Sequence, residues 1–203
     1  MAGCECEHEV QQLQERQSKM LVIILLINAI MFFVEAGAGF FAKSSALLAD
    51  SMDMLGDALV YGFSLYVVAR SPRWKAGSAL LKGLIQLGFG LLVLGITFYK
   101  LIHPVVPIAA AISGIGLLAL VANAVCAGLL LRHRHDDLNM NSVWLCSRND
   151  LVNNVAVIVA GIAVAVSQSQ WPDILVGLGI ALLFLHTSYG VLSRSIGELR
   201  TAS

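Results

Sequence analysis

Two pairs of side chains in this sequence have the spacing of metal ligands. Asp53 and Asp57 stand four residues apart, and Cys146 and Asp150 repeat that spacing. Residues four apart lie on one face of a helix, so the members of each pair can share a ligand. Two neighbouring carboxylates repel each other unless a cation or protons neutralise them. Carboxylate oxygens combined with a thiolate suit tetrahedral Zn²⁺, and the thiolate also accepts the softer Cd²⁺.

Several of these residues also have a purely structural interpretation. A single buried aspartate can be a hydrogen-bonded partner, and Cys146 alone would be a small buried hydrophobic residue. Asp50 is either a third ligand or a group at the start of a helix, and we favour the helix start. Hydrogen bonds between helices are expected from five asparagines, Asn28, Asn123, Asn149, Asn153 and Asn154. The last two, which follow Asp150, could instead line a hydrated path.

The composition places these residues in a membrane. Of 203 residues, 58% are hydrophobic and 13% are charged, against about 25% charged in an ordinary soluble domain. We therefore expect an all-α membrane protein, a bundle of six transmembrane helices. Its apolar segments, each long enough to cross about 30 Å of hydrocarbon, are residues 20–41, 45–69, 77–100, 105–131, 142–167 and 171–192. All four prolines fall between these segments or in their first turns, where a missing N–H does no harm.

Ionisable residues well inside these segments are informative, because each costs about 2.5–3.5 kcal/mol at a helix centre. They are Glu35, Asp50, Asp53, Asp57, Lys82, Arg148 and Asp150. Five acids against two bases leave an excess of three negative charges, which calls for a cation or for protons. Lys82 and Arg148 are expected to neutralise neighbouring acids such as Glu35 or Asp50. Because the second and fifth segments run in opposite directions, the two pairs should meet near the middle of the membrane.

The distribution of lysine and arginine predicts the orientation of the chain. With the N-terminus inside, the outer connections carry only Lys43 and Lys100, whereas the inner side carries Arg16, Lys19, Arg70, Arg73, Lys75, Arg132, Arg134, Arg194 and Arg200. Both termini should therefore face the cytoplasm, and no removable signal peptide is expected. We expect a cytoplasmic tail over 1–19, a six-helix transmembrane domain over 20–192, and a short cytoplasmic tail over 193–203. Thirteen basic and thirteen acidic residues balance, so no nucleic-acid partner is expected.

Two further clusters of possible ligands, with less specific patterns, are candidates for weak metal binding on the cytoplasmic side. Cys4, Cys6 and His8 alternate with glutamates in the N-terminal tail. His133 and His135 stand beside two aspartates in the connection after the fourth segment. Thiolates and imidazoles are both good zinc ligands. The alternative is a solvated tail and a solvated loop without a metal role.

Three stretches carry a resemblance to a known family: NAIMFFVEAGAGFFAKSSALLADSMDMLGDAL (28–59), LRHRHDDLNMNSVW (131–144) and WPDILVGLGIALLFL (171–185). Through them the chain resembles the cation diffusion facilitators, which are proton-coupled exporters of divalent metals. In that family the second helix carries His or Asp, three residues, then Asp, and the fifth carries His, three residues, then Asp. The resemblance assigns these positions to Asp53, Asp57, Cys146 and Asp150. Cysteine thus stands where histidine is usual, which favours Zn²⁺ and Cd²⁺.

The resemblance implies a function, partners and a location. The expected activity is metal/H⁺ antiport out of the cytoplasm, with Zn²⁺ as substrate and Cd²⁺ or Co²⁺ as further candidates. Metal and protons would compete for the same carboxylates and thiolate, which couples their movements. Family members are homodimers, and with eleven residues after Leu192 the chain resembles a short branch without the usual C-terminal cytoplasmic domain. A multi-pass protein of the bacterial inner (plasma) membrane is expected, with no resident cofactor.

Two other classes of function were weighed against transport. A non-transporting membrane protein, which binds the metal as a sensor or an accessory subunit, is the alternative. An enzyme is not expected, because the HExxH and GxSxG motifs of metalloproteases and hydrolases are absent. Transport, measured directly, separates the first two classes.

Overall fold

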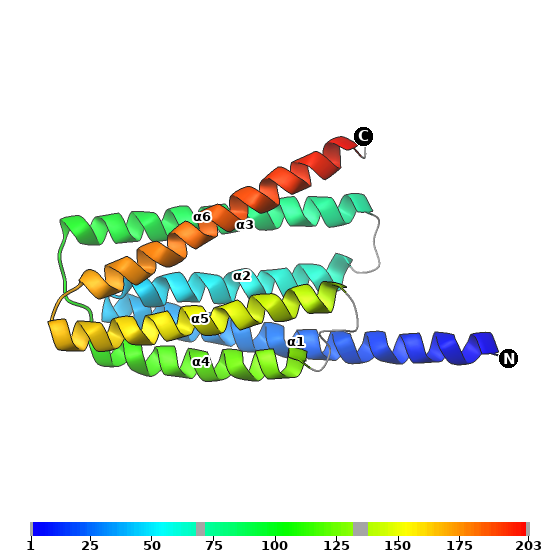
Figure 1. Cartoon of the computed structure of the whole chain (residues 1–203), viewed down its shortest axis with the longest axis horizontal. Coiled ribbons are helices and arrows are strands. Elements are labelled where there is room, and N and C mark those ends of the chain that lie inside the picture. Colours follow the sequence, from blue (N-terminus) through cyan, green and yellow to red (C-terminus); the bar gives the residue numbers. More distant parts are fainter. Residues whose placement is uncertain (1, 68–71, 132–137, 202–203) are drawn as a thin grey trace.

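The computed structural model describes the backbone of residues 2–67, 72–131 and 138–201, and the side chains of residues 18–62, 65, 80–81, 83–131, 144 and 150–193. The described backbone forms six helices, α1 (Ala2–Ala42), α2 (Ser45–Val67), α3 (Pro72–Ile102), α4 (Ala109–Leu131), α5 (Leu138–Ser167) and α6 (Trp171–Thr201). Successive helices run in opposite directions, so both chain ends lie at one end of the bundle (Figure 1). We name this the terminal end, and the opposite end, where α1 joins α2 and α5 joins α6, the far end.

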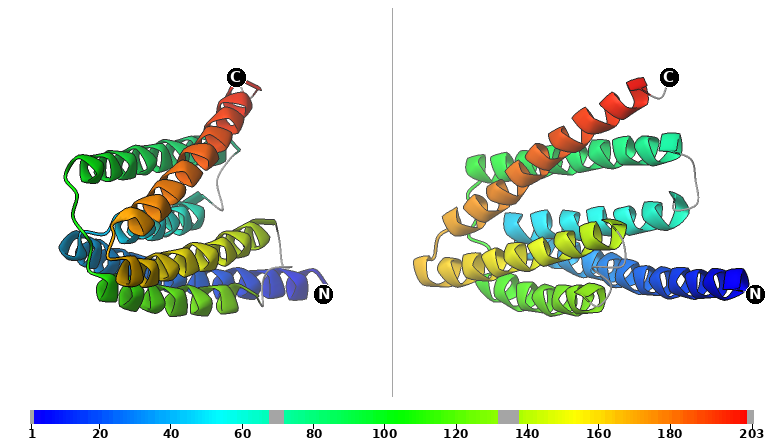
Figure 2. Two further views of the ribbon diagram at one scale, coloured as in Figure 1. Left: turned by 60° about the vertical axis from the view of Figure 1, so that its left-hand side comes forward. Right: turned by 45° about the vertical axis from the view of Figure 1, so that its right-hand side comes forward.

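The helices form two groups (Figures 1 and 2). One group is the pair α3 and α6, which pack extensively against each other, and the other consists of α1, α2, α4 and α5. In the described part of the chain, the α3–α6 pair contacts the second group only through α2 and α5. α2 contacts every other helix and is therefore the central one.

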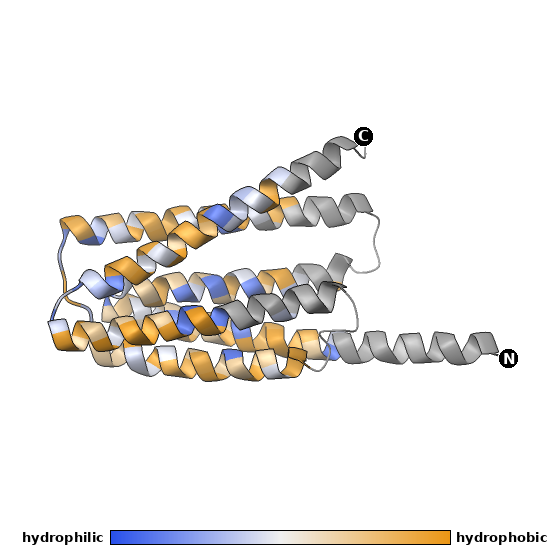
Figure 3. Ribbon diagram, viewed as in Figure 1, coloured by the Kyte–Doolittle hydropathy of each residue, from blue (hydrophilic) through white to orange (hydrophobic). Residues whose placement is uncertain are grey.

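Large apolar side chains cover the outside of the bundle. Phe41 and Val166 are 79% and 82% exposed, and five of the described helices are long and apolar enough to cross a membrane. α2 is also long enough, but every 18-residue stretch of it contains Asp50, Asp53 and Asp57. Hydrophilic positions lie in the middle of α2 and α5, among mostly hydrophobic ones (Figure 3). The chain is thus a multi-pass membrane protein, and the helix with three central aspartates is the one enclosed by the others.

The helix boundaries agree with the predicted segments at residues 45, 131, 167 and 171. The fourth helix was expected from residue 105 but begins at Ala109, because Pro107 holds the residue before it in an extended conformation. The Ile108 N–H, just before this helix, donates to the Ala42 carbonyl at the end of α1. The first helix was expected from residue 20, and it begins at Ala2. The backbone of the N-terminal tail therefore continues α1.

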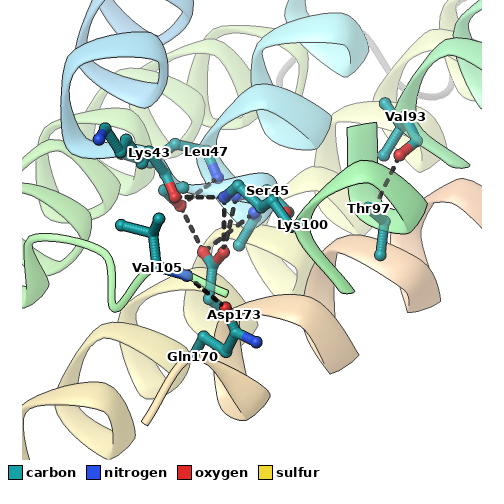
Figure 4. Close-up of polar contacts among 11 residues, drawn as sticks. Lys43, Ser45, Leu47, Val93, Thr97, Lys100, Val105, Gln170 and Asp173 are labelled. Carbon is teal, nitrogen blue, oxygen red and sulfur yellow. Dashed lines mark hydrogen bonds and ion pairs between the residues drawn. The ribbon is translucent and has the colours of Figure 1, made fainter. Parts of the chain in front are cut away.

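A buried carboxylate from α6 caps the start of α2 (Figure 4). Asp173 accepts a hydrogen bond from the Ser45 N–H at 2.7 Å and another from the Ala46 N–H at 3.1 Å. The Ser44 hydroxyl donates to Asp173 at 2.5 Å and accepts from the Leu47 N–H at 3.1 Å. First-turn N–H groups have no partner within their own helix, and the helix dipole favours a negative charge beside them. Asp173 therefore accepts the hydrogen bonds of first-turn N–H groups of α2, although it lies in a distant part of the chain.

Lys100, near the end of α3, completes this cluster. Its Nζ lies 3.3 Å from Asp173 Oδ2 and donates to the Lys43 carbonyl just past α1. Gly177 lets α6 approach closely, since a Cβ there would lie 3.0 Å from the Ser45 carbonyl carbon. The Asp173 carboxylate, which is 1% exposed, thus joins α6 to α2 and α3 at the far end, and Lys100 extends the cluster to the residue after α1. No role was predicted for Asp173 from the sequence, because it lies in the first turn of its predicted segment and not well inside it.

Asp173→Ala should strongly destabilise the protein. It removes the acceptor of two first-turn N–H groups and leaves Lys100 buried without its carboxylate, and breaking a buried ion pair costs about 3–5 kcal/mol. Thermal unfolding of the purified protein in detergent should show a much lower midpoint. The control is Gln170→Ala, which removes an exposed acceptor of the Val105 N–H and should cost about 1 kcal/mol or less. Equal losses in the two variants would contradict this role of Asp173.

Candidate metal centre

Two acids from different helices meet in the middle of the bundle. Asn153 of α5 donates a hydrogen bond to Asp53 Oδ2 of α2 at 3.0 Å. The Asp150 carboxyl, one turn before Asn153, lies close to the Asp53 carboxyl. Two carboxylates that lie this close repel each other unless a proton or a cation neutralises them. The structure thus brings together one member of each predicted pair, at a place where positive charge is required.

Asp57 lies one helical turn nearer the terminal end than Asp53. It acts electrostatically on Asp53, and its Oδ2 accepts a hydrogen bond from the Tyr61 hydroxyl at 2.9 Å. Cys126 of α4, a buried free thiol, is close enough to Asp57 for the two to interact electrostatically. Tyr61 and Cys126 were not singled out in the sequence. The i, i+4 spacing of Tyr61 from Asp57 was an available signal, whereas nothing in the sequence ties Cys126 to α2.

The backbone of Cys146 lies in α5, one turn nearer the terminal end than Asp150. Since α2 and α5 run in opposite directions, this is the same displacement that separates Asp57 from Asp53. The Cys146 side chain lies outside the described side chains. Among the side chains that are described, no three acids, cysteines or histidines are grouped closely enough to hold a metal ion.

A second layer of polar contacts surrounds Asp50. The Asn154 amide donates to both oxygens of Asp50, at 3.0 and 2.9 Å, and accepts from the Asn123 amide at 2.9 Å. The three side chains come from α2, α5 and α4, and each is at most 1% exposed. The expectation that Asp50 marks a helix start was wrong, because α2 begins at Ser45 and its capping carboxylate is Asp173.

The remaining predicted residues have varied placements. Interhelical hydrogen bonds are confirmed for Asn123, Asn153 and Asn154, whereas Asn28 donates to Ile24 of its own helix. Glu35 is fully buried, and none of the described side chains donates a hydrogen bond to it. The side chains of Lys82, Arg148 and Asn149, together with those of Cys4, Cys6, His8, His133 and His135, lie outside the described residues.

Asn154→Leu should destabilise the protein by about 1–3 kcal/mol, because it leaves the buried Asp50 and Asn123 without their partner. The matched variant is Asn153→Ala on the same helix. Asn153 and its acceptor Asp53 are only partly buried, so water can replace that contact at a smaller cost. Chemical or thermal unfolding in detergent measures both. If Asn153→Ala lost as much stability as Asn154→Leu, the larger contribution that we assign to the buried Asn154 contacts would be wrong.

A family model described as the cation efflux transmembrane domain matches residues 21–199. The cadmium, cobalt and zinc/H⁺-K⁺ antiporter of Bacillus velezensis is 25% identical over 194 residues, which cover 87% of this chain and 62% of that protein. The zinc transporter ZitB of Yersinia pestis is 25% identical over 199 residues, covering 92% and 64%.

A third relative, the zinc transporter ZitB of Pectobacterium atrosepticum, is 26% identical over 208 residues, covering 95% of this chain and 64% of that protein. The chain therefore spans less than two thirds of the length of these curated relatives. Six helices, five of them able to cross a membrane, fit a transmembrane domain of this kind. Because the family match covers residues 21–199, the chain belongs to the cation efflux family, a family of transporters and not of enzymes.

Proposed function

We propose that this chain exports a divalent metal in exchange for protons, with Zn²⁺ as substrate and Cd²⁺ or Co²⁺ as further candidates. The observation that carries the proposal is the hydrogen bond from Asn153 of α5 to Asp53 of α2, which brings the Asp150 carboxyl close to Asp53. Two carboxyl groups close together inside an apolar bundle repel each other, and either a proton or a metal ion between them relieves that repulsion. The Bacillus relative, named as an antiporter of these metals with H⁺ and K⁺, supports the same exchange.

The proposed ligands are Asp53 and Asp57 of α2 with Cys146 and Asp150 of α5. Metal binding requires ionised carboxylates and a thiolate, so a bound ion displaces whatever protons these groups hold. Reprotonation from the other side of the membrane then weakens metal binding and releases the ion. The site lies where the two helix groups meet, because α2 and α5 are the helices through which the α3–α6 pair contacts the rest.

The orientation is part of the proposal. Both chain ends lie at the terminal end (Figure 1), and nine of the thirteen lysines and arginines belong to the connections and helix ends on that side. By the positive-inside rule we place the terminal end in the cytoplasm and the far end outside. A homodimer in a bacterial inner membrane, with residues 20–192 as the transmembrane cation-efflux domain between tails over 1–19 and 193–203, completes the proposal. Metal capture by Cys4, Cys6, His8, His133 and His135 would serve the cytoplasmic entrance.

Asp57→Asn should abolish Zn²⁺-driven proton movement, because it removes one charged ligand while nearly preserving side-chain size. The measurement uses purified protein in liposomes loaded with a pH-sensitive dye, and Asp150→Asn should behave in the same way. Gln170→Ala, at the far end, is the matched control and should keep the native flux. Normal flux in Asp57→Asn would refute the assigned site. Zinc binding without flux in the native chain would favour a sensor or accessory subunit instead.

Cys146→His should retain Zn²⁺ transport but lose preference for Cd²⁺. Imidazole and thiolate both bind zinc well, whereas the softer thiolate is the better cadmium ligand. The ratio of Cd²⁺ to Zn²⁺ transport, measured in the same liposomes, reports the change. Cys126→Ser is the matched control, since Cys126 is a buried cysteine that is not a proposed ligand. An unchanged ratio in Cys146→His would remove Cys146 from the site.

A further inference from the structure

Tyr61 of α2 donates a buried hydroxyl to one of the proposed metal ligands. The hydroxyl lies 2.9 Å from Asp57 Oδ2, and the tyrosine is 1% exposed. The two residues are four apart on one helix, where side chains lean toward the helix N-terminus. Tyr61 therefore reaches back over Asp57 from the terminal-end side.

The ring of Tyr61 is held by an apolar cluster between helices. The other buried members of this cluster come from α1 and α4, and they are Met20, Leu21, Ile24, Cys126 and Leu130. Close packing of this kind leaves a side chain few alternative rotamers. Because two neighbouring helices fix the ring, the direction from which its hydroxyl meets Asp57 is fixed as well.

This hydrogen bond bears on how Asp57 can bind a metal ion. A carboxylate binds a metal through one oxygen or through both. A hydrogen bond to one oxygen weakens that oxygen as a ligand and stops the group from rotating, so the metal is bound through the other oxygen. Single-oxygen binding keeps the coordination number low, which suits the four-coordinate geometry of Zn²⁺. Larger coordination numbers suit ions such as Mn²⁺.

We propose that Tyr61 is a positioning residue of the metal site, whose hydroxyl holds Asp57 so that this carboxylate binds through its other oxygen and favours four-coordinate ions. The inference rests on the proposed function, since it takes Asp57 as a ligand. Tyr61 acts through Asp57 and does not itself bind the metal. A purely structural tyrosine would contribute its ring to the apolar cluster, so the test must separate the hydroxyl from the ring.

Tyr61→Phe keeps the ring and removes the hydroxyl, so Zn²⁺ affinity should fall about tenfold. Isothermal titration calorimetry of the full chain in lipid nanodiscs measures this affinity. Co²⁺ is the spectroscopic probe, because tetrahedral Co²⁺ absorbs visible light much more strongly than Co²⁺ with more ligands. The absorption of bound Co²⁺ should therefore weaken in Tyr61→Phe. Native Zn²⁺ affinity or a native Co²⁺ spectrum in this variant would overturn the proposal.

Ser51→Ala is the matched control. It removes another hydroxyl of α2, one that donates to the Leu48 carbonyl at 2.8 Å. Zn²⁺ affinity and the Co²⁺ spectrum should both keep their native values. Equal losses in Ser51→Ala and Tyr61→Phe would show a general effect of lost hydroxyls on the helix, which contradicts a specific role of Tyr61.

A second pair of variants carries the test even if Tyr61→Phe fails to fold. Tyr61→Gln and Tyr61→Leu both remove the ring and are similar in size, but only the glutamine keeps a donor that can reach an aspartate four residues earlier. Tyr61→Gln should therefore bind Zn²⁺ more tightly than Tyr61→Leu. Equal affinities would mean that the hydroxyl has no role, which overturns the proposal.

The two proposals fail separately. If Asp57→Asn loses Zn²⁺ binding while Tyr61→Phe keeps it, the role of Tyr61 is refuted and the metal site stands. If Tyr61→Phe weakens Zn²⁺ binding but the native chain shows no zinc-driven proton flux, the role of Tyr61 stands and the transport function is refuted.

Discussion

The structure depends on the cost of placing carboxylates in hydrocarbon. Each such group costs about 2.5–3.5 kcal/mol at a helix centre, and α2 alone carries Asp50, Asp53 and Asp57. That helix is the one in contact with all the others, and the outside of the bundle is apolar. Buried asparagines of α4 and α5 supply donors in place of water, as Asn154 does for Asp50. The central position of α2 therefore keeps its three aspartates away from lipid and beside donors on the neighbouring helices.

The same central position ties Asp53 and Asp150 to any movement between the two helix groups. The α3–α6 pair contacts the remaining helices through α2 and α5, which carry Asp53 and Asp150. Any displacement between the two groups must therefore change contacts of these two helices. At the far end, the Asp173 carboxylate of α6 holds the first turn of α2, and Lys100 of α3 holds the Lys43 carbonyl next to α1. The two groups are thus tied at one end by a single buried polar cluster.

The sequence by itself determined the number of helices and the helix ends at residues 45, 131, 167 and 171, because apolar length and proline position act locally. It also determined that Asp53 and Asp57 share a face, since helical spacing is a property of one segment. Other assignments depended on which helices become neighbours. Asp50 was misread as a helix-start group, while the capping carboxylate was Asp173, 128 residues away from Ser45. Only the tertiary structure could show this, or that Asn154 donates to both oxygens of Asp50, because each depends on packing between segments far apart in the chain.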